Sequence, residues 1–224
     1  MVYVHGESFE WGSGNPYDGS ILASHGRVVV VTLNYRLGVL GFLKTSGRNE
    51  QQGTGLHDQL AALHWLQENV GAFGGDPARI TIFGHGTGAA LVNLHLLSKI
   101  TKGIIRRAIL MSGSALSPWG FLRDPLETKK QVGESLNCSL ERPDREDLAP
   151  CLRLKSLFSL LNAEPAPPAF TPAYGPFVDL NMVVSSPDYL LRRYKGETDL
   201  LVGVTTAESF LDLNDRDVKF GFEE

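Results

Sequence analysis

The five residues Gly84, His85, Gly86, Thr87 and Gly88 nearly match a catalytic pattern. A nucleophile elbow reads Gly-x-Ser-x-Gly and places its serine at a sharp turn from a strand into a helix, where the hydroxyl attacks a carboxylic ester. The middle position here is Gly86, which has no side chain to attack with. Thr87 carries a hydroxyl one position later, and we expect it to point away from the catalytic direction. The pattern therefore predicts the turn without the nucleophile.

An acyl-transfer site also needs a base, an acid that orients it and N–H donors for the oxyanion. Ser112 and Ser114 are further hydroxyls, but they lie in no elbow. We predict that His5 and His85 each serve in packing or hydrogen bonding rather than as the base. The other histidines show no metal-ligand spacing with a second His or Cys, so we predict no metal: they are His25, His57, His64 and His95.

Strands and helices alternate along the chain around this cluster. Residues 1–6 and 27–35 are β-branched runs without polar alternation, which favours strands covered on both faces of a mostly parallel sheet. Leucines recur at helical spacing along residues 55–73, and the turn residues 74–77 end that helix. A strand over 78–84 and a helix over 89–98 would then flank the cluster. This strand-to-helix junction is the setting that an elbow requires.

The second half of the chain continues the alternation. Residues 104–113 predict another strand, residues 124–136 a helix and residues 163–176 a proline-rich surface connection. Residues 198–208 predict a last, buried strand. The fold class is therefore α/β, and we find no internal repeat.

Composition excludes several classes of protein. The 224 residues are 42% hydrophobic and 21% charged, typical of a globular protein with a large core. A formal net charge of −4 argues against nucleic acid as a partner. No apolar run approaches the ~18 residues that span a bilayer. The start of the chain carries no signal-like segment before the first predicted strand, and we expect the chain to be part of a longer protein.

A glycine-rich cluster with one mismatch is weak evidence, since any tight strand-to-helix turn of an α/β protein could carry it. Longer segments of the sequence give stronger evidence. In order and spacing, the segments 2–15, 29–43, 55–84 and 108–116 resemble the type-B carboxylesterases and cholinesterases. Within that family, four segments resemble neuroligins, of the invertebrate type: 18–38, 68–77, 113–119 and 217–224.

The resemblance implies an α/β-hydrolase fold whose active site is degenerate. Residues 1–224 would form part of one carboxylesterase type-B-like domain, which lacks its N-terminal strands and C-terminal portion. Gly86 falls on the nucleophile position and Glu208 on that of the acid, while the family's histidine would lie beyond residue 224. Glu7 and Ser8 stand where oxyanion-loop glycines are expected, and an inward-pointing Glu7 carboxylate would oppose a developing oxyanion.

The chain has two cysteines, Cys138 and Cys151, which in a cytosolic protein would be free thiols. The segment 137–151 is similar to the small disulfide loop of secreted members of the family, which implies a Cys138–Cys151 bridge. Such a bridge would stabilise the protein by ~3 kcal/mol in the chain-entropy model. Asn137 begins an Asn-x-Ser sequon for glycosylation. The bridge and the sequon together predict an extracellular location.

The resemblance implies a non-catalytic adhesion ectodomain that binds a neurexin-like protein in trans at synaptic cell contacts. It further implies a homodimer and a membrane anchor, both formed outside this chain, with no cofactor except calcium bridging at the partner interface. The candidate contacts are Glu208, Ser209, Leu211 and Asp212, although an acidic loop is also typical of plain solvated surface. A carboxylesterase with an unusual nucleophile remains the alternative, and a non-catalytic binder with an apolar gorge is a third hypothesis.

Overall fold

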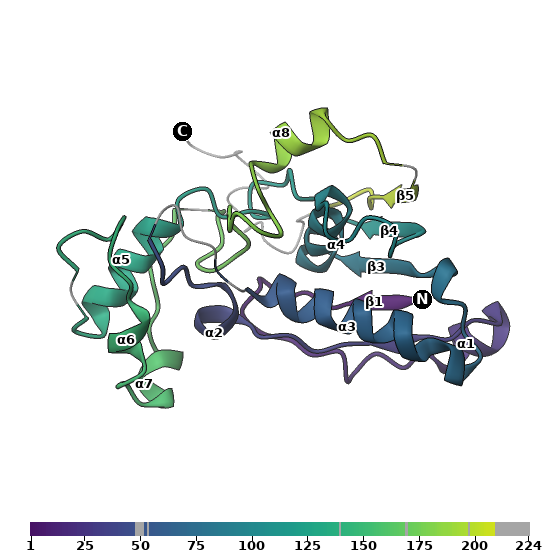
Figure 1. The fold of residues 1–224 in the computed structure, drawn as a ribbon, viewed down its shortest axis with the longest axis horizontal. Coiled ribbons are helices and arrows are strands. Elements are labelled where there is room, and N and C mark those ends of the chain that lie inside the picture. Colours follow the sequence, from purple (N-terminus) through teal and green to yellow (C-terminus); the bar gives the residue numbers. More distant parts are fainter. Residues whose placement is uncertain (48–51, 53, 139, 169, 197, 209–224) are drawn as a thin grey trace.

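The computed structural model describes residues 1–208, apart from residues 48–51, 53, 139, 169 and 197. Five parallel strands form one sheet in the order β2-β1-β3-β4-β5 (Figure 1). The strands are β1 Val2–Val4, β2 Val31–Thr32, β3 Thr81–His85, β4 Arg107–Met111 and β5 Asp199–Gly203. The predicted α/β architecture with a mostly parallel sheet is confirmed.

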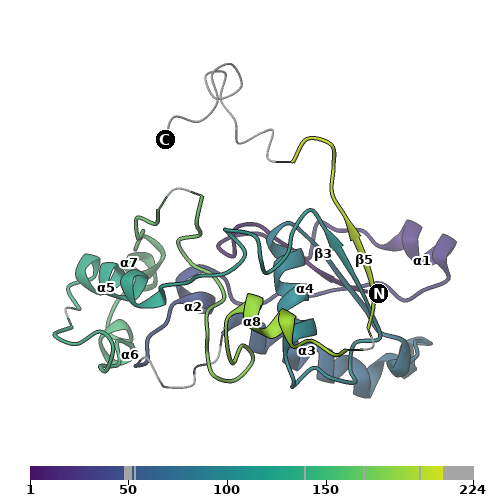
Figure 2. The same cartoon turned by 90° about the horizontal axis from the view of Figure 1, so that it is seen from above.

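Helices lie on both sides of this sheet. Figure 2 shows α3, α4 and α8 on one side of the strands and α1 on the other, while α5, α6 and α7 form a separate group beyond the sheet. The α-helices are α1 Ser20–Gly26, α2 Gly38–Phe42, α3 Gly55–Asn69, α4 Thr87–Leu97, α5 Pro125–Ser135, α6 Ala149–Leu152, α7 Leu157–Leu161 and α8 Pro187–Arg192. Two 3₁₀ helices, η1 Val70–Phe73 and η2 Pro77–Arg79, connect α3 to β3.

Local sequence explains where α3 begins and where its extension stops. Thr54 accepts a hydrogen bond from the Leu56 amide, and the His57 ring in turn accepts from the Thr54 amide, so the two residues form a capping box. Gly74 ends η1 at a φ of 79°, a left-handed conformation that glycine adopts without a Cβ penalty. The helix predicted over residues 55–73 is thus confirmed, with its last turn tightened to a 3₁₀ helix.

The core lies around α4, which is buried on almost every side. Its buried residues include Ala89, Leu91, Val92 and Leu94, and it contacts β1, β3, β4 and α8. A helix that is apolar all round belongs in a protein interior rather than on its surface. Because α4 follows β3 directly, its burial fixes the position of the turn between them.

Three sequence-based expectations need correction. The strand predicted over 27–35 is reduced to Val31–Thr32. Residues 163–176 are not wholly a surface connection, since Ala163 and Tyr174 are buried and the Tyr174 hydroxyl donates to the Ala163 carbonyl at 2.5 Å. β5 is a strand, but all five of its residues are exposed. It lies at the edge of the sheet, where no described element covers it.

A covalent bond and a buried charge link α5, α6 and the segment after α2. Cys138 and Cys151 form a disulfide with Cα atoms 5.9 Å apart, as expected. The fully buried Lys129 on α5 donates from Nζ to the carbonyl oxygens of Ser46 at 3.0 Å and Pro143 at 2.9 Å, and also to that of Glu146. Pro143 and Glu146 belong to the loop before α6 and Ser46 to the segment after α2, so one ammonium group joins both segments to α5.

Candidate functional site

The turn between β3 and α4 has the backbone of a nucleophile elbow. Gly86 is the N-cap of α4, with φ 56° and ψ −121°. Its amide donates to the Met111 carbonyl at 2.9 Å, and its own carbonyl accepts from the Ala90 amide at 3.1 Å. A positive φ costs an ordinary residue ~1–3 kcal/mol, whereas glycine adopts it freely. Glycine therefore allows the sharp turn at this position without strain, and no side chain projects from it.

The three glycines of the turn are required for different reasons. A Cβ atom on Gly88 would lie 2.3 Å from the Val4 carbonyl oxygen, and one on Gly84 would lie 2.5 Å from the Gly88 carbonyl carbon. A Cβ atom on Gly86 would have no heavy atom of the described residues within 4 Å. Gly84 and Gly88 thus allow close backbone approach, while Gly86 has room for a side chain and is constrained by its dihedral angles alone.

The loop after β1, at the position expected for oxyanion donors, is closed on itself. The Glu7 amide donates to the Trp11 carbonyl at 3.3 Å, and the Glu7 carbonyl accepts from the amides of Glu10 and Trp11. Ser8 and Phe9 follow with φ values of 55° and 62°. Glu7 and Ser8 are both exposed, so the Glu7 carboxylate does not point into the interior.

His5 has the packing role predicted for it. Its ring is buried, stacks on Tyr35 with centroids 4.5 Å apart, and contacts the Gly6 carbonyl through Nδ1 at 2.6 Å. The Tyr35 hydroxyl donates to the His5 carbonyl at 2.6 Å, and burial raises the pKa of this tyrosine. The prediction for His85 is wrong in part, because this side chain is exposed at the end of β3 instead of packed.

The Thr87 hydroxyl points away from the open side of the turn, as predicted. Its Oγ1 atom is buried with no hydrogen-bond partner in the described part of the chain. A Cβ atom on Gly6 would lie 2.9 Å from this oxygen, which places the hydroxyl against the loop after β1. In the described structure, the Thr87 hydroxyl is therefore not accessible to a substrate.

Glu208 lies beyond the end of β5 and carries an exposed carboxylate. Its Oε1 accepts from the Thr205 amide at 2.5 Å, and the Ser112 hydroxyl at the end of β4 also donates to it. These two hydrogen bonds, with a smaller contribution from the nearby charge of His85, lower the pKa of Glu208. The structure thus brings Ser112, His85 and Glu208 to the same edge of the sheet as Gly86. Ser209, Leu211 and Asp212 lie outside the described residues.

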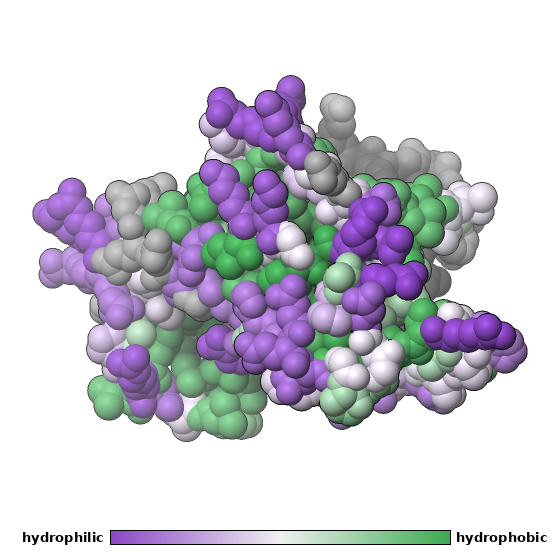
Figure 3. Space-filling view, turned by 45° about the vertical axis from the view of Figure 1, so that its right-hand side comes forward, coloured by the Kyte–Doolittle hydropathy of each residue, from purple (hydrophilic) through white to green (hydrophobic). Residues whose placement is uncertain are grey.

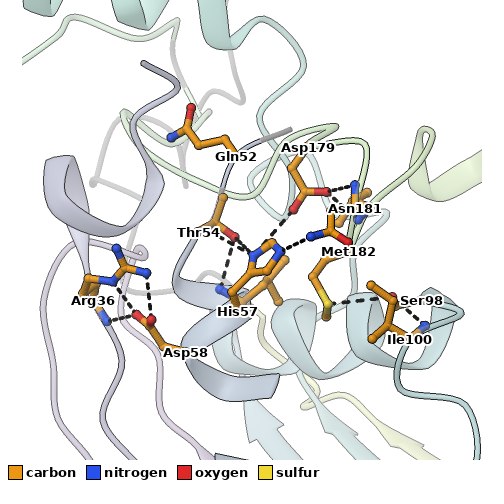
Figure 4. Close-up of polar contacts among 12 residues, drawn as sticks. Arg36, Gln52, Thr54, His57, Asp58, Ser98, Ile100, Asp179, Asn181 and Met182 are labelled. Carbon is orange, nitrogen blue, oxygen red and sulfur yellow. Dashed lines mark hydrogen bonds and ion pairs between the residues drawn. The ribbon is translucent and has the colours of Figure 1, made fainter. Parts of the chain in front are cut away.

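A buried polar cluster at the start of α3 was not singled out from the sequence (Figure 4). Asp179 is fully buried, and its Oδ1 accepts from the amides of Asn181 and Val183 at 2.9 and 2.8 Å. Its Oδ2 lies 3.9 Å from the Nδ1 atom of His57, while the Asn181 side-chain amide lies 2.9 Å from Nε2. Burial raises the pKa of Asp179. The Thr-x-x-His spacing at residues 54–57 was the available signal, as a variant of the capping box.

The cluster holds the start of α3 against the segment around Asp179, so its role is structural. Nearby, Asp58 forms an exposed bidentate ion pair with Arg36, with both N–O distances 2.8 Å. Among the described residues, no group of three His, Cys, Asp or Glu side chains is placed to hold a metal ion. None of the described helices combines the length and the apolar character needed to cross a membrane. Asn137 is exposed, with a φ of 52°.

Comparison with known proteins agrees with this geometry. The model of the carboxylesterase family matches residues 1–220. Neuroligin-2 of Mus musculus is 43% identical over 218 residues, which cover 96% of this chain and 26% of that protein. Neuroligin-3 of Homo sapiens is 43% identical over 211 residues, covering 93% and 24%. Bile salt-activated lipase of Rattus norvegicus is 38% identical over 226 residues, covering 94% and 36%.

The chain spans roughly a quarter to a third of the length of these relatives. The resemblance to neuroligins is confirmed by the identity to two of them along nearly the whole chain. The parallel sheet with flanking helices is the predicted α/β-hydrolase arrangement. The family model matches residues 1–220, and the sheet and the turn at Gly86 agree with it. The chain therefore belongs to the carboxylesterase family.

Proposed function

We propose that the chain is part of a non-catalytic adhesion protein of the neuroligin kind. The observation that carries this proposal is Gly86, a residue without a side chain at the centre of the elbow turn. No acyl-enzyme can form there, since an acyl-enzyme needs a side-chain nucleophile. The 43% identity to neuroligins supports the same conclusion.

The loop after β1 supports the absence of catalysis independently of Gly86. An oxyanion hole needs N–H groups that are free and aimed at the developing charge. The Glu7 amide instead donates to the Trp11 carbonyl, and the Glu7 carbonyl accepts two further amides. Restoring a serine at Gly86 would therefore leave the Glu7 amide unavailable to an oxyanion.

The proposed partner is a neurexin-like protein on an opposing cell, bound in trans at a synaptic contact. Glu208 is exposed and its carboxylate is held by two hydrogen bonds, so it presents a fixed negative charge at the edge of the sheet. We include Ser209, Leu211 and Asp212 in the proposed contact and place calcium between the two proteins, because carboxylate oxygens suit that ion. A homodimer, a membrane anchor and an extracellular location at the cell junction belong to the same proposal.

Catalysis is tested on the complete protein with activated esters and an organophosphate, with rat bile salt-activated lipase as the positive control. We expect no burst, no saturable turnover and no covalent label on the peptide that contains residues 81–91. Gly86→Ser has room for its side chain, so the variant should fold, yet it should gain little activity for lack of oxyanion donors. Stoichiometric labelling of the unmodified protein at Thr87, together with saturable turnover, would contradict the proposal and favour an esterase.

The partner is tested by charge reversal in the complete protein. With calcium present, we expect Glu208→Lys combined with Asp212→Lys to weaken the affinity for a neurexin ectodomain at least tenfold, because two carboxylates are lost from the contact. Glu134→Lys on α5, which is also exposed, is the control and should bind as the unmodified protein does. Equal affinity of the double variant and the unmodified protein would remove these residues from the proposed contact.

A further inference from the structure

A groove between α2 and α7 combines apolar walls with two carboxylates. Its volume is about 320 Å³, which lies at the lower end of the range for ligand pockets. The acidic residues that line it are Glu10 and Glu164, and none of the described residues that line it is basic. The apolar walls come from Leu37, Val39, Leu160, Leu161, Ala163 and Pro165.

The two carboxylates face the same space and repel each other. The Glu10 carboxylate lies against the backbone amides of Ala173 and Tyr174, which orient it. Glu10 as a whole residue is exposed, but the groove walls partly desolvate its carboxyl group, which is the main cause of its raised pKa; the charge of Glu164 adds to it. Neither carboxylate has an ion-pair partner among the described residues. The groove therefore carries uncompensated negative charge.

Several large apolar side chains next to the groove are exposed. On α7, the side chains of Leu157, Phe158 and Leu161 are 61%, 77% and 60% exposed, and Leu154 just before the helix is 85% exposed. Figure 3 shows hydrophobic surface gathered at the lower left, the height at which Figure 1 draws α7. Exposed apolar patches with polar rims mark contact surfaces.

We propose that this groove, between Glu10, Glu164 and the apolar face of α7, binds an arginine side chain and its apolar neighbours from a partner polypeptide. A guanidinium group matches carboxylates in charge and planar shape, and its aliphatic stem packs on apolar walls. A divalent cation fits less well, because calcium requires six to eight oxygen ligands and these walls are hydrocarbon. The exposed side chains of α7 extend the contact beyond the volume of a single residue.

The proposal is tested by titrating the complete protein with the fluorescent peptide acetyl-Leu-Arg-Leu-amide and with the same peptide carrying citrulline. Citrulline keeps the shape of arginine and removes its charge. We expect saturable binding of the arginine peptide, at least tenfold weaker binding of the citrulline peptide, and weakening when the salt concentration is raised from 50 to 500 mM, roughly as exposed ion pairs are screened.

Variants separate the groove from general acidity. Glu10→Gln with Glu164→Gln should weaken binding at least tenfold, and Leu161→Ser should weaken it without changing its salt dependence. The control Glu134→Gln with Glu141→Gln removes the same charge from exposed positions elsewhere and should bind normally. All four substituted glutamates are exposed, so the folded state should survive, which a thermal unfolding curve checks.

Three outcomes would overturn the proposal. Absence of saturable binding would mean that another part of the complete protein occupies the groove. Guanidinium chloride binding as tightly as the peptide would show that the apolar walls contribute nothing. Self-association that the Glu10→Gln and Glu164→Gln pair abolishes would assign the groove to a second copy of the protein. None of these results depends on neurexin binding or on esterase activity, so the function proposed above stands or fails separately.

Discussion

The turn at Gly86 and the group of helices α5 to α7 are held in place by different means. At the turn, long apolar elements pack so closely that backbone atoms touch, and Gly84 and Gly88 leave the space for them. The helices α6 and α7 have only four and five residues, too few to bury much apolar surface. A disulfide joins α6 to Cys138, just after the end of α5, and the buried Lys129 joins α5 to the loop before α6. Close backbone packing can maintain a sharp turn whether or not a side chain stands on it, whereas short elements need covalent or polar links.

The largest effect should come from a side chain forced into the turn. Gly88→Ala places a methyl group 2.3 Å from the Val4 carbonyl oxygen, which is backbone and cannot move aside. We expect the free energy of unfolding to fall by about 4 kcal/mol or more, the range of severe overpacking. The midpoint of urea unfolding of the complete protein measures it.

Two matched variants separate the clash from strain. Gly86→Ala has free space but a positive φ and should cost ~1–3 kcal/mol, while Gly71→Ala has neither problem and should stay within ~0.5 kcal/mol. Equal effects of Gly88→Ala and Gly86→Ala would show that close backbone packing does not hold the turn.

The second prediction concerns the polar tie in the α5 to α7 group. Lys129→Met keeps the length of the side chain and removes the ammonium, which leaves three carbonyl oxygens without their donor. We expect a loss of about 3 kcal/mol in the free energy of unfolding, because buried polar groups without partners are costly. Chemical denaturation measures the loss.

Lys130→Met is the matched control, since Lys130 is exposed and its ion-pair partner within the described part of the chain is Glu134, also at the surface. It should change the stability by less than about 0.5 kcal/mol. If Lys129→Met proved as stable as this control, the hydrogen bonds of the buried ammonium group would not stabilise this region, and the disulfide would be its main link.

The third prediction concerns pH and the far end of α4. His95 is fully buried, and its Nε2 lies 2.8 Å from Oε1 of Gln59 on α3. Burial, with a smaller effect of the His57 charge, lowers the pKa of His95 to about 3 from its ordinary value of 6.5. Between these two values the unfolded chain binds a proton at this residue and the folded chain does not.

The stabilising effect of neutral His95 is therefore fully present above pH 6.5 and is lost as the pH falls toward 3. The slope is about 1.4 kcal/mol per pH unit. In urea unfolding at a series of pH values, His95→Gln should remove this part of the slope, whereas His64→Gln, at an exposed site on α3, should keep it. Parallel stability curves for His95→Gln and the unmodified protein would contradict the assignment.

The sequence alone determined the order and type of the main elements, because apolar periodicity and turn residues are local properties. It predicted the helix that became α3, the strand-to-helix turn at Gly86 and the elements on either side. The disulfide pairing came from the family resemblance rather than from spacing.

Only the tertiary structure decided which residues are covered. β5 has the composition of a buried strand, yet it is exposed because burial depends on neighbours that are distant in sequence. His57 and Asp179 are 122 residues apart in the sequence, and Lys129 and Ser46 are 83 residues apart. No local sequence pattern predicts either contact. His85, adjacent to Gly86, turned out exposed for the same reason: the direction of a side chain at a sharp turn is set by what packs against it.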